Sequence, residues 1–256
     1  MPSQVRKRFG QHFLVDQGII DRIFQTINVR SDQRLLEIGP GRGELTAGLS
    51  RLSNRVVAIE LDRDLVKNLE SKYPNTSFIQ GDVLKQPLEN YEGFRVVGNL
   101  PYEISTPLIT KLIENVQVID MHFMLQREVA QRLVAQPRTK EYGRLSVVVQ
   151  YWCEVSSLFN VEPESFQPPP KVRSSFVCLR PKETVPEDID YQDFKRVVSL
   201  AFSQRRKTLR NSLKELSIGW DTSEISSRLR ADEVSLEQYL TFTRQLTAKS
   251  DSNKSL

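Results

Sequence analysis

The sequence is poor in the residues that most often build metal sites and disulfide scaffolds. It contains two cysteines, two histidines and two tryptophans in 256 residues. Cys153 and Cys178 each lie inside an apolar run, so we expect two buried thiols in a reducing cytosol rather than a disulfide framework. Metal ligands need close clustering, and His12 and His122 are far apart in the sequence. We therefore expect no metal cofactor.

Long apolar stretches are also missing. No run approaches the roughly 18 residues of a membrane-spanning helix, and the mean hydropathy is −0.41. The basic N-terminus is not followed by the apolar core of a signal peptide. A hydrophobic content of 39% and a charged content of 27% are typical of a globular protein. We expect a cytoplasmic protein without a membrane partner, with one large and one small domain.

No charge of either sign dominates. The 36 Lys and Arg residues exceed the 32 Asp and Glu residues only slightly, so the net charge of +4 does not by itself indicate nucleic acid. The distribution is more informative, because cations gather in two clusters: Arg6, Lys7 and Arg8, and Arg205, Arg206, Lys207 and Arg210. Such clusters fit an RNA-binding role and equally fit a solvated helix face.

Short strand-like runs alternate with helical patterns over the first two thirds of the chain. There are five short apolar runs: residues 34–38, 55–59, 77–79, 94–97 and 119–125. Each of the first four is followed within two residues by Gly or Glu. Segments 45–52 and 64–73 have helical spacing between them. This alternation predicts an α/β fold with five parallel strands, covered on both faces by helices.

Two later runs, residues 145–155 and 174–179, predict an antiparallel pair of strands at one edge of the sheet. Four prolines in residues 163–170 exclude a crossover helix between these runs. The segment 181–186 predicts a domain boundary, and helical spacing follows it. We expect a catalytic domain over residues 1–180 and a small helical domain over residues 181–256.

The strongest local signal is the segment Glu37-Ile38-Gly39-Pro40-Gly41-Arg42-Gly43, directly after the first predicted strand. Glycines let the backbone turn tightly and approach a ligand, and ligands of open α/β sheets bind at the carboxyl ends of the strands. Glu60 ends the second strand, where it can accept both hydroxyls of a ribose. Asp82 ends the third, where it can accept from an adenine amino group. These features fit NAD as well as S-adenosylmethionine.

The segment Asn99-Leu100-Pro101-Tyr102 follows the fourth predicted strand. An exocyclic adenine nitrogen is a poor nucleophile, because its lone pair is delocalised into the ring. The Asn99 side-chain oxygen and the Leu100 carbonyl could hold its two hydrogens. Pro101 restricts the backbone and Tyr102 offers an aromatic face to the base. This pattern favours methyl transfer to an adenine amine.

Five segments in this order resemble the KsgA family of small-subunit (16S) ribosomal RNA adenine dimethyltransferases. They are residues 11–14 (QHFL), 37–41 (EIGPG), 99–102 (NLPY), 166–172 (FQPPPKV) and 202–211 (FSQRRKTLRN). The resemblance covers nearly the whole chain. It implies a class I methyltransferase fold, a Rossmann-like sheet with a small C-terminal helical domain. It also implies S-adenosylmethionine as donor and N6,N6-dimethylation of two adjacent adenosines near the 3′ end of the RNA.

The family pattern assigns roles to individual positions. The donor site would be lined by His12, Leu14, Gly39, Gly41, Glu60, Asp82 and Asn99. His12 is a departure, since we expect Asn there in many members. Phe166 would supply a second ring facing the base, beside the catalytic segment 99–102. Lys140, Arg144, Lys171 and Arg173 are expected near phosphates, or else merely solvated.

Two other functions remain open at this point. One is methylation of large-subunit ribosomal RNA or of DNA at adenine. The other is a mainly non-catalytic factor that occupies the immature small ribosomal subunit during assembly. The family resemblance favours a monomeric enzyme with small-subunit ribosomal RNA and the immature subunit as its partners.

Overall fold

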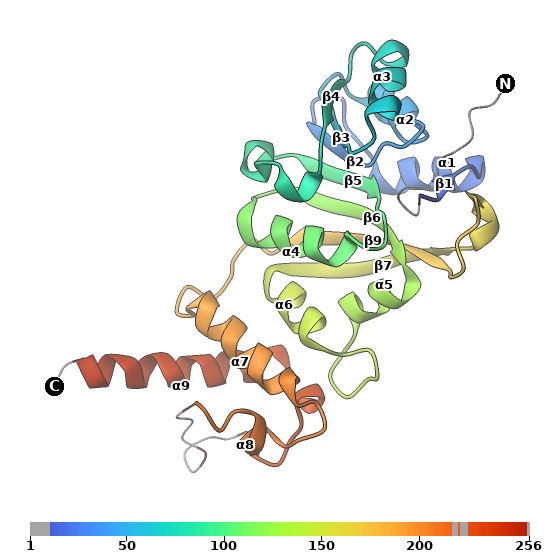
Figure 1. Cartoon of the computed structure of the whole chain (residues 1–256). Helices are drawn as coiled ribbons and strands as arrows, with labels where there is room; N and C mark the ends of the chain where they lie inside the picture. Colours follow the sequence, from blue (N-terminus) through green and yellow to red (C-terminus); the bar gives the residue numbers. More distant parts are fainter. Residues whose placement is uncertain (1–10, 217–219, 221–224, 255–256) are drawn as a thin grey trace. The chain divides into compact units, whose positions relative to one another are not determined.

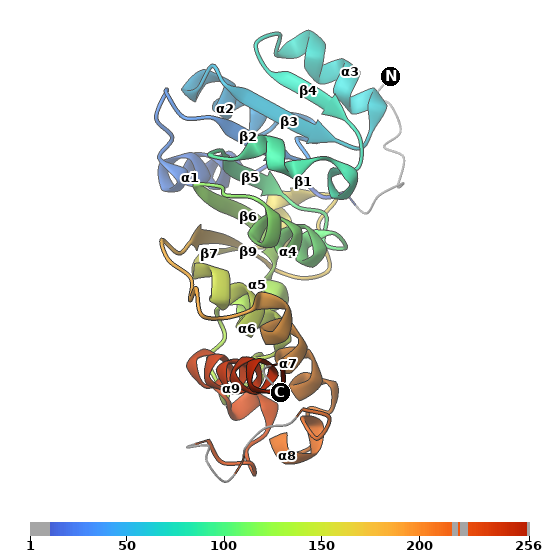
Figure 2. The ribbon, with the colours of Figure 1, turned by 90° about the vertical axis from the view of Figure 1, so that its left-hand side faces the viewer.

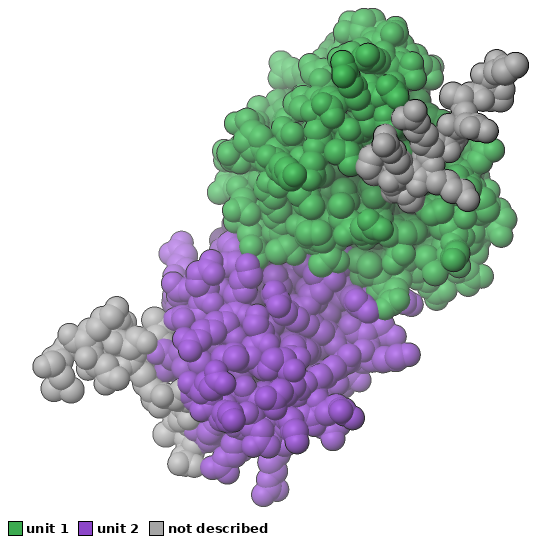
Figure 3. All heavy atoms as spheres, viewed as in Figure 1, with its two compact units in different colours: residues 1–130, 154–181 green, residues 131–153, 182–256 purple. Residues whose placement is uncertain are grey.

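The computed structural model describes residues 11–216, 220 and 225–254 (Figure 1). The chain divides into two compact units, coloured separately in Figure 3. Residues 1–130 and 154–181 form the first, here called the sheet unit. Residues 131–153 and 182–256 form the second, here called the helical unit.

The sheet unit is built on a seven-stranded sheet with the order β4-β3-β2-β5-β6-β9-β7. Its strands are β2 (Leu35–Ile38), β3 (Val56–Glu60), β4 (Ser77–Gln80), β5 (Arg95–Asn99), β6 (Asp120–Gln126), β7 (Cys153–Val161) and β9 (Ser174–Pro181). The five strands from β4 to β6 in this order pair in parallel, and β9 pairs antiparallel with β6. The prediction of five parallel strands with two more at one edge is confirmed.

Helices cover both faces of this sheet, as Figure 2 shows for α1 and α4 on opposite sides. Asp16 and Asp62 accept hydrogen bonds from the first backbone N–H groups of α1 and α3, which fixes where these helices begin. The connecting elements are α1 (Gln17–Ile27), α2 (Thr46–Leu52), α3 (Arg63–Lys72), η1 (Val83–Lys85), η2 (Leu88–Tyr91), α4 (Ser105–Asn115), α5 (Arg127–Val134) and η3 (Pro163–Ser165).

A small antiparallel sheet ties the start of the described chain to a loop far along the sequence. Strand β1 (Phe13–Leu14) pairs with β8 (Phe166–Gln167). The next residues continue the attachment, because Val15 N donates to Ser165 O at 2.8 Å and Ser165 Oγ donates to Asp16 Oδ2 at 3.0 Å. Residues 11–16 are therefore held in place by a segment more than 140 positions away.

One predicted strand is wrong. Residues 145–155 were expected to be extended, but α6 (Arg144–Trp152) occupies most of this run and β7 begins only at Cys153. Val147, Val148 and Val149 are all buried, with exposed fractions of 0%, 5% and 0%. A short apolar run that is buried all round can be a strand or a helix, and periodicity alone does not separate them.

The predicted domain boundary also needs correction. Residues 131–153 belong with the helical unit rather than with the large domain over residues 1–180. The reason is tertiary: Tyr142 is 1% exposed, and its hydroxyl donates to Val234 O at 2.9 Å. Two separate segments of the chain therefore contribute to the helical unit, and no local sequence pattern predicts this.

The remaining elements of the helical unit are α7 (Tyr191–Ser203), α8 (Leu209–Ser212), η4 (Ala231–Glu233) and α9 (Leu236–Lys254). Its core is formed by fully buried side chains of α7 and α9, among them Phe194, Val197, Tyr239 and Phe242. Asp190 accepts from Asp193 N at 2.9 Å and so caps α7. A helical C-terminal part is confirmed.

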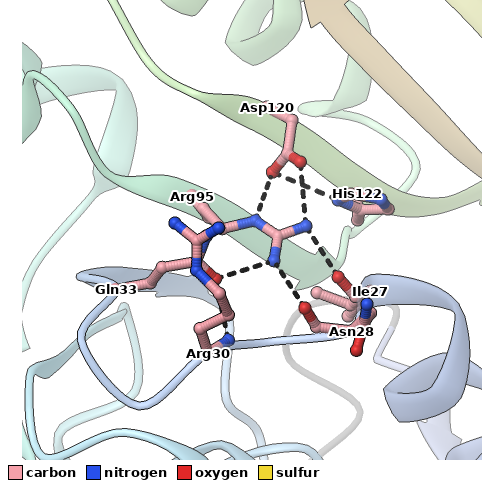
Figure 4. Close-up of polar contacts among 7 residues, drawn as sticks. All are labelled: Ile27, Asn28, Arg30, Gln33, Arg95, Asp120 and His122. Carbon is pink, nitrogen blue, oxygen red and sulfur yellow. Dashed lines mark hydrogen bonds and ion pairs between the residues drawn. The ribbon is translucent and has the colours of Figure 1, made fainter.

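A buried polar cluster holds the end of α1 against the sheet (Figure 4). The Arg95 guanidinium donates to both carboxylate oxygens of Asp120, at 2.8 and 2.9 Å, and to the Ile27 carbonyl at 2.7 Å. Burial alone would raise the pKa of Asp120, but its interactions with His122 and Arg95 hold it at about 2. Burial alone would lower the pKa of His122, but its interaction with Asp120 raises it to about 9. Both shifts favour the charged forms of Asp120 and His122.

Cys153 and Cys178 are both buried, as expected from their apolar surroundings, and they form no disulfide. Among the described residues, no helix combines the length and the apolar character needed to cross a membrane. Over the same part of the chain, His, Cys, Asp and Glu side chains form no group of three or more that could hold a metal ion.

Candidate active site

A cleft of about 500 Å³, open to solvent, lies where β2, β3 and β5 end. Its lining residues are Gln11, His12, Phe13, Gly39, Gly41, Glu60, Asn99, Leu100, Pro101 and Tyr102. Strands β3 and β5 flank β2, so the cleft is at the point where the strand order reverses. This is where the sequence placed a nucleotide-like ligand.

The glycine loop after β2 has a conformation that side chains disfavour. Gly39 and Gly41 have φ values of +67° and +61°, in the left-handed region. A Cβ on Gly41 would meet the Phe13 ring at 3.1 Å. The loop therefore brings bare backbone to the wall of the cleft, as a ligand that must approach closely requires.

Glu60 is buried at the end of β3 and is held by the backbone. Its Oε2 accepts from Gly41 N at 3.1 Å, and its Oε1 accepts from Asp62 N at 3.0 Å. Burial raises the pKa of Glu60, and these hydrogen bonds oppose the rise. Each carboxylate oxygen has a second lone pair. The fixed carboxylate can therefore accept hydroxyl groups from a ligand in the cleft.

A second, smaller hollow of about 270 Å³ lies beside the cleft and is lined by Glu37 and Glu44. Glu37 is 1% exposed and accepts from Thr46 Oγ1 at 2.7 Å. Burial raises the pKa of Glu37 to about 8, and the negative charges of Glu44 and Glu60 add to this. With Glu60 in the neighbouring cleft, three carboxyl groups surround the glycine loop, and its raised pKa keeps Glu37 in the uncharged form at neutral pH.

Asn99 has a defined orientation. Its Nδ2 donates to the His12 carbonyl oxygen at 2.8 Å. The side-chain amide is planar, so this bond turns Oδ1 away from His12 and leaves it to accept from a ligand. Asn99 lines both the cleft and the smaller hollow.

The His12 side chain makes two further contacts around the cleft. Its Nδ1 is 2.7 Å from the carbonyl oxygen of Pro168, and because a carbonyl can only accept, this nitrogen is the donor. Its ring stacks on Tyr102 with a centroid separation of 5.8 Å and an angle of 30°. His12, which stands where Asn was expected, therefore connects its own segment 11–14 with the predicted segments 99–102 and 166–172.

Tyr102 forms another part of the wall of the cleft. Its hydroxyl lies 3.0 Å from Ser174 Oγ, at the start of β9, which fixes the plane of the ring. Leu100 N donates to Met124 O at 3.2 Å, so the backbone of the Asn-Leu-Pro-Tyr segment is tied to β6. Asn99, Leu100, Pro101 and Tyr102 all line the cleft. The structure thus brings the whole predicted catalytic segment together.

Two other predicted donor-site residues have different surroundings. Asp82 lines neither of these hollows, and its Oδ1 accepts from Leu84 N at 3.0 Å as the cap of η1. Leu14 lines the smaller hollow while its side chain packs in the core.

Phe166 differs most from its expected role. It is 3% exposed and belongs to the core cluster with Leu14, Phe159 and Phe176. Its ring was expected to face the base, but pairing of β8 with β1 directs it inward instead.

The structure describes only one of the two basic clusters found in the sequence. Arg6, Lys7 and Arg8 lie outside the described residues. Arg205, Arg206 and Lys207 form a turn between α7 and α8, so the four-residue spacing to Arg210 does not create a shared helix face. All four side chains are exposed. Arg173, one of the cations expected near phosphates, forms an ion pair with Glu162 at 2.8 Å.

Sequence reasoning missed several residues of the site. Gln11 and Phe13 line the cleft although only their neighbours His12 and Leu14 had been assigned to it. Ser174 and Glu44 were not singled out. The QHFL motif and the glycine loop were available signals for Gln11, Phe13 and Glu44, whereas Ser174 depends on how β9 enters the sheet.

The sheet order and the chemistry of this cleft place the chain among the class I methyltransferases. The model of the family "Ribosomal RNA adenine dimethylase" matches residues 2–248. The chain belongs to this family.

Similar proteins agree with that membership. Ribosomal RNA small subunit methyltransferase A of Pseudomonas aeruginosa is 50% identical over 254 residues, covering 95% of both chains. The protein of the same name from Pseudomonas syringae pv. tomato is 47% identical and covers 96% of both. The crystal structure of a dimethyladenosine transferase from Plasmodium falciparum has a TM-score of 0.81 and 27% identity, covering 93% of this chain and 98% of its own. The 23S rRNA methyltransferase ErmE has a TM-score of 0.71 and 27% identity, covering 92% and 99%.

Proposed function

We propose that this chain transfers methyl groups from S-adenosylmethionine to N6 of two adjacent adenosines near the 3′ end of small-subunit ribosomal RNA. The observation that carries the proposal is the hydrogen bond from Asn99 Nδ2 to His12 O, because it leaves an amide oxygen as acceptor in the cleft. Family membership and the relatives named as small-subunit methyltransferases support the choice of substrate.

The residues of the cleft fit the donor. Glu60 presents a carboxylate for two hydroxyl groups. Asp82 is not part of the lining but follows the adjacent strand β4 by two residues. The bare backbone at Gly39 and Gly41 allows close approach, and the Glu44 carboxylate in the adjoining hollow favours a cation. Their arrangement suits a molecule that carries both a ribose and positive charge. The bound donor supplies an electrophilic methyl group on a sulfonium centre.

Asn99 and Leu100 act in catalysis as hydrogen-bond acceptors. The Asn99 Oδ1 and the Leu100 carbonyl hold the two hydrogens of the adenine amine and favour a tetrahedral nitrogen. Tyr102, fixed by Ser174, supports the base by stacking, which contributes about 1–3 kcal/mol. The base must leave its stack to reach this cleft. With the amine held in this way, the donor would pass its methyl group to the nitrogen and leave as a neutral thioether, and the nitrogen would lose one proton to water.

We propose that the sheet unit is catalytic and that the helical unit contacts the ribosomal subunit. Exposed cations at Arg206, Lys207 and Arg210 support the second assignment. The enzyme would act on the immature small subunit, as a monomer and in the cytoplasm. Light scattering on the purified protein tests the monomer, and its failure would not affect the catalytic proposal.

The test is transfer of labelled methyl groups to purified small subunits that lack the modification. Nucleoside analysis should yield N6,N6-dimethyladenosine, with two modified adenosines per subunit. Large subunits and duplex DNA serve as competing substrates. Label in either of these and not in small subunits would overturn the substrate assignment. Tight binding to subunits without any transfer would favour the assembly factor instead.

A further inference from the structure

Three segments of the helical unit lie side by side although they are far apart in the sequence. Arg205 Nη2 donates to the carbonyl oxygens of Lys140 and Tyr142, at 2.8 and 3.2 Å. Arg138 N donates to Asp232 O at 2.7 Å, and Thr208 forms a β-bridge with Arg230. The loop 136–142, the turn 205–208 and the segment 226–232 are thus joined by backbone and side-chain hydrogen bonds.

This junction is rich in exposed cations. Arg138 and Lys140 come from the loop, Arg206 and Lys207 from the turn, and Arg230 from the third segment. The carboxylates nearby are fewer than the cations, and one of them, Glu141, lies in the loop itself. Asp232 pairs with Arg205 at 3.6 Å, and Glu233 Oε2 accepts from Arg230 N at 2.7 Å. The surface therefore presents positive charge that local carboxylates do not balance.

Arg205 differs from the other cations of the cluster. Its guanidinium is committed to two carbonyl groups of the loop and to Asp232. Arg138 has a φ of +70°, which is uncommon for a residue with a side chain, and the bond from its N–H to Asp232 O holds this conformation. The loop thus has a defined shape that depends on contacts with the C-terminal part of the chain.

We propose that the loop 136–142 is an RNA contact of this enzyme. Arg138 and Lys140 bind phosphates together with Arg206 and Lys207, and Arg205 is a positioning residue that shapes the loop. A guanidinium and an ammonium group both suit phosphate oxygens, and each contact releases counterions. The inference rests on the proposed function, since it takes ribosomal RNA as the partner.

The first experiment measures binding of unmethylated small subunits in increasing KCl. The R138A/K140A variant should bind more weakly, and its slope of log K against log salt should be shallower by about 1.4–1.8, at about 0.7–0.9 per phosphate. Donor affinity should stay unchanged. The R51A/K67A variant removes the same charge from exposed positions on α2 and α3, and should keep the wild-type slope. An unchanged slope in R138A/K140A, or an equal change in the control, would overturn the proposal.

The second experiment separates positioning from contact at Arg205. Arg205→Lys keeps the charge, but its single nitrogen lies one bond nearer the backbone than Nη2, so it cannot contact both carbonyl groups and Asp232 at once. If Arg205 shapes the loop, R205K should lower subunit affinity nearly as much as R138A/K140A, and combining the two should add little. Wild-type affinity in R205K, or a fully additive loss, would assign Arg205 to direct contact instead. If the wild type neither binds nor methylates subunits, the proposed function fails; if it does both while the loop variants behave as wild type, only this inference fails.

Discussion

Asn99 Nδ2 lies 2.8 Å from the carbonyl oxygen of His12, and this single hydrogen bond decides which end of the Asn99 amide is available in the cleft. The two residues come from segments 87 positions apart. Because a backbone carbonyl cannot donate, it selects the NH₂ group and leaves the oxygen for the substrate amine.

Asn99→Ala should therefore lower kcat on unmethylated small subunits by about 10²–10³-fold, the usual loss when one preorganised hydrogen-bonding group is removed from a transition state. Subunit affinity should change little. Asn115→Ala is the matched control, because the Asn115 side chain bonds to its own helix at Lys111 O. Wild-type turnover in the Asn99 variant would contradict the acceptor role.

Glu60→Gln should weaken binding of S-adenosylmethionine. The variant loses the charge that strengthens hydrogen bonds to the ribose, worth about 1.5–3 kcal/mol, and one acceptor atom toward Gly41 or Asp62. Titration calorimetry should show a fall in affinity of about 10- to 150-fold. Exposed Glu70→Gln on α3 should bind as the wild type does. Tight NAD binding by the wild type would refute the donor assignment itself.

Glu37 predicts how stability depends on pH. Burial raises its pKa from 4.5 to about 8 in the folded state, so the folded protein holds this proton more tightly than the unfolded chain. This contribution to the free energy of unfolding is complete below pH 4.5 and is lost as pH rises through about 8. A tenfold difference in proton affinity between the folded and unfolded states corresponds to about 1.4 kcal/mol.

Glu37→Gln should flatten this dependence, because the amide mimics the protonated acid and can still accept from Thr46. Urea unfolding of both proteins at about pH 5 and about pH 9 provides the comparison, since these values lie on either side of the transition. Exposed Glu70→Gln should retain the wild-type fall between the two pH values. Equal falls in the wild type and the Glu37 variant would show that another group is responsible.

Asp120→Asn should destabilise the fold by about 3–5 kcal/mol, since it leaves the Arg95 guanidinium buried without its countercharge. The matched control is Asp32→Asn. Asp32 pairs with Arg30 at 3.5 Å, but both side chains are more than 70% exposed, and such pairs contribute about 1 kcal/mol or less. Comparable unfolding midpoints for the two variants would show that the buried pair does not anchor α1.

Many elements of the fold could be read from local patterns. The runs 34–38, 55–59 and 94–97 are apolar, short and punctuated by glycine or polar residues, and each became a parallel strand. The run 145–155 is also apolar, yet most of it is helical. A short apolar segment that is buried on every side can form either a strand or a helix. The Phe166 ring likewise lies in the core, because β8 pairs with β1.

The sequence alone predicts which chemical groups stand at the ends of the strands: a glycine loop, then Glu60, then Asn99. Such signals are local, since they depend on residue types within a few positions. Three features depend on folding in three dimensions: residues 131–153 join the helical unit, His12 sets the orientation of Asn99, and Arg205 holds the loop 136–142. The last two contacts join segments more than 60 residues apart, and their partners are backbone carbonyls, which every residue carries and no sequence pattern marks.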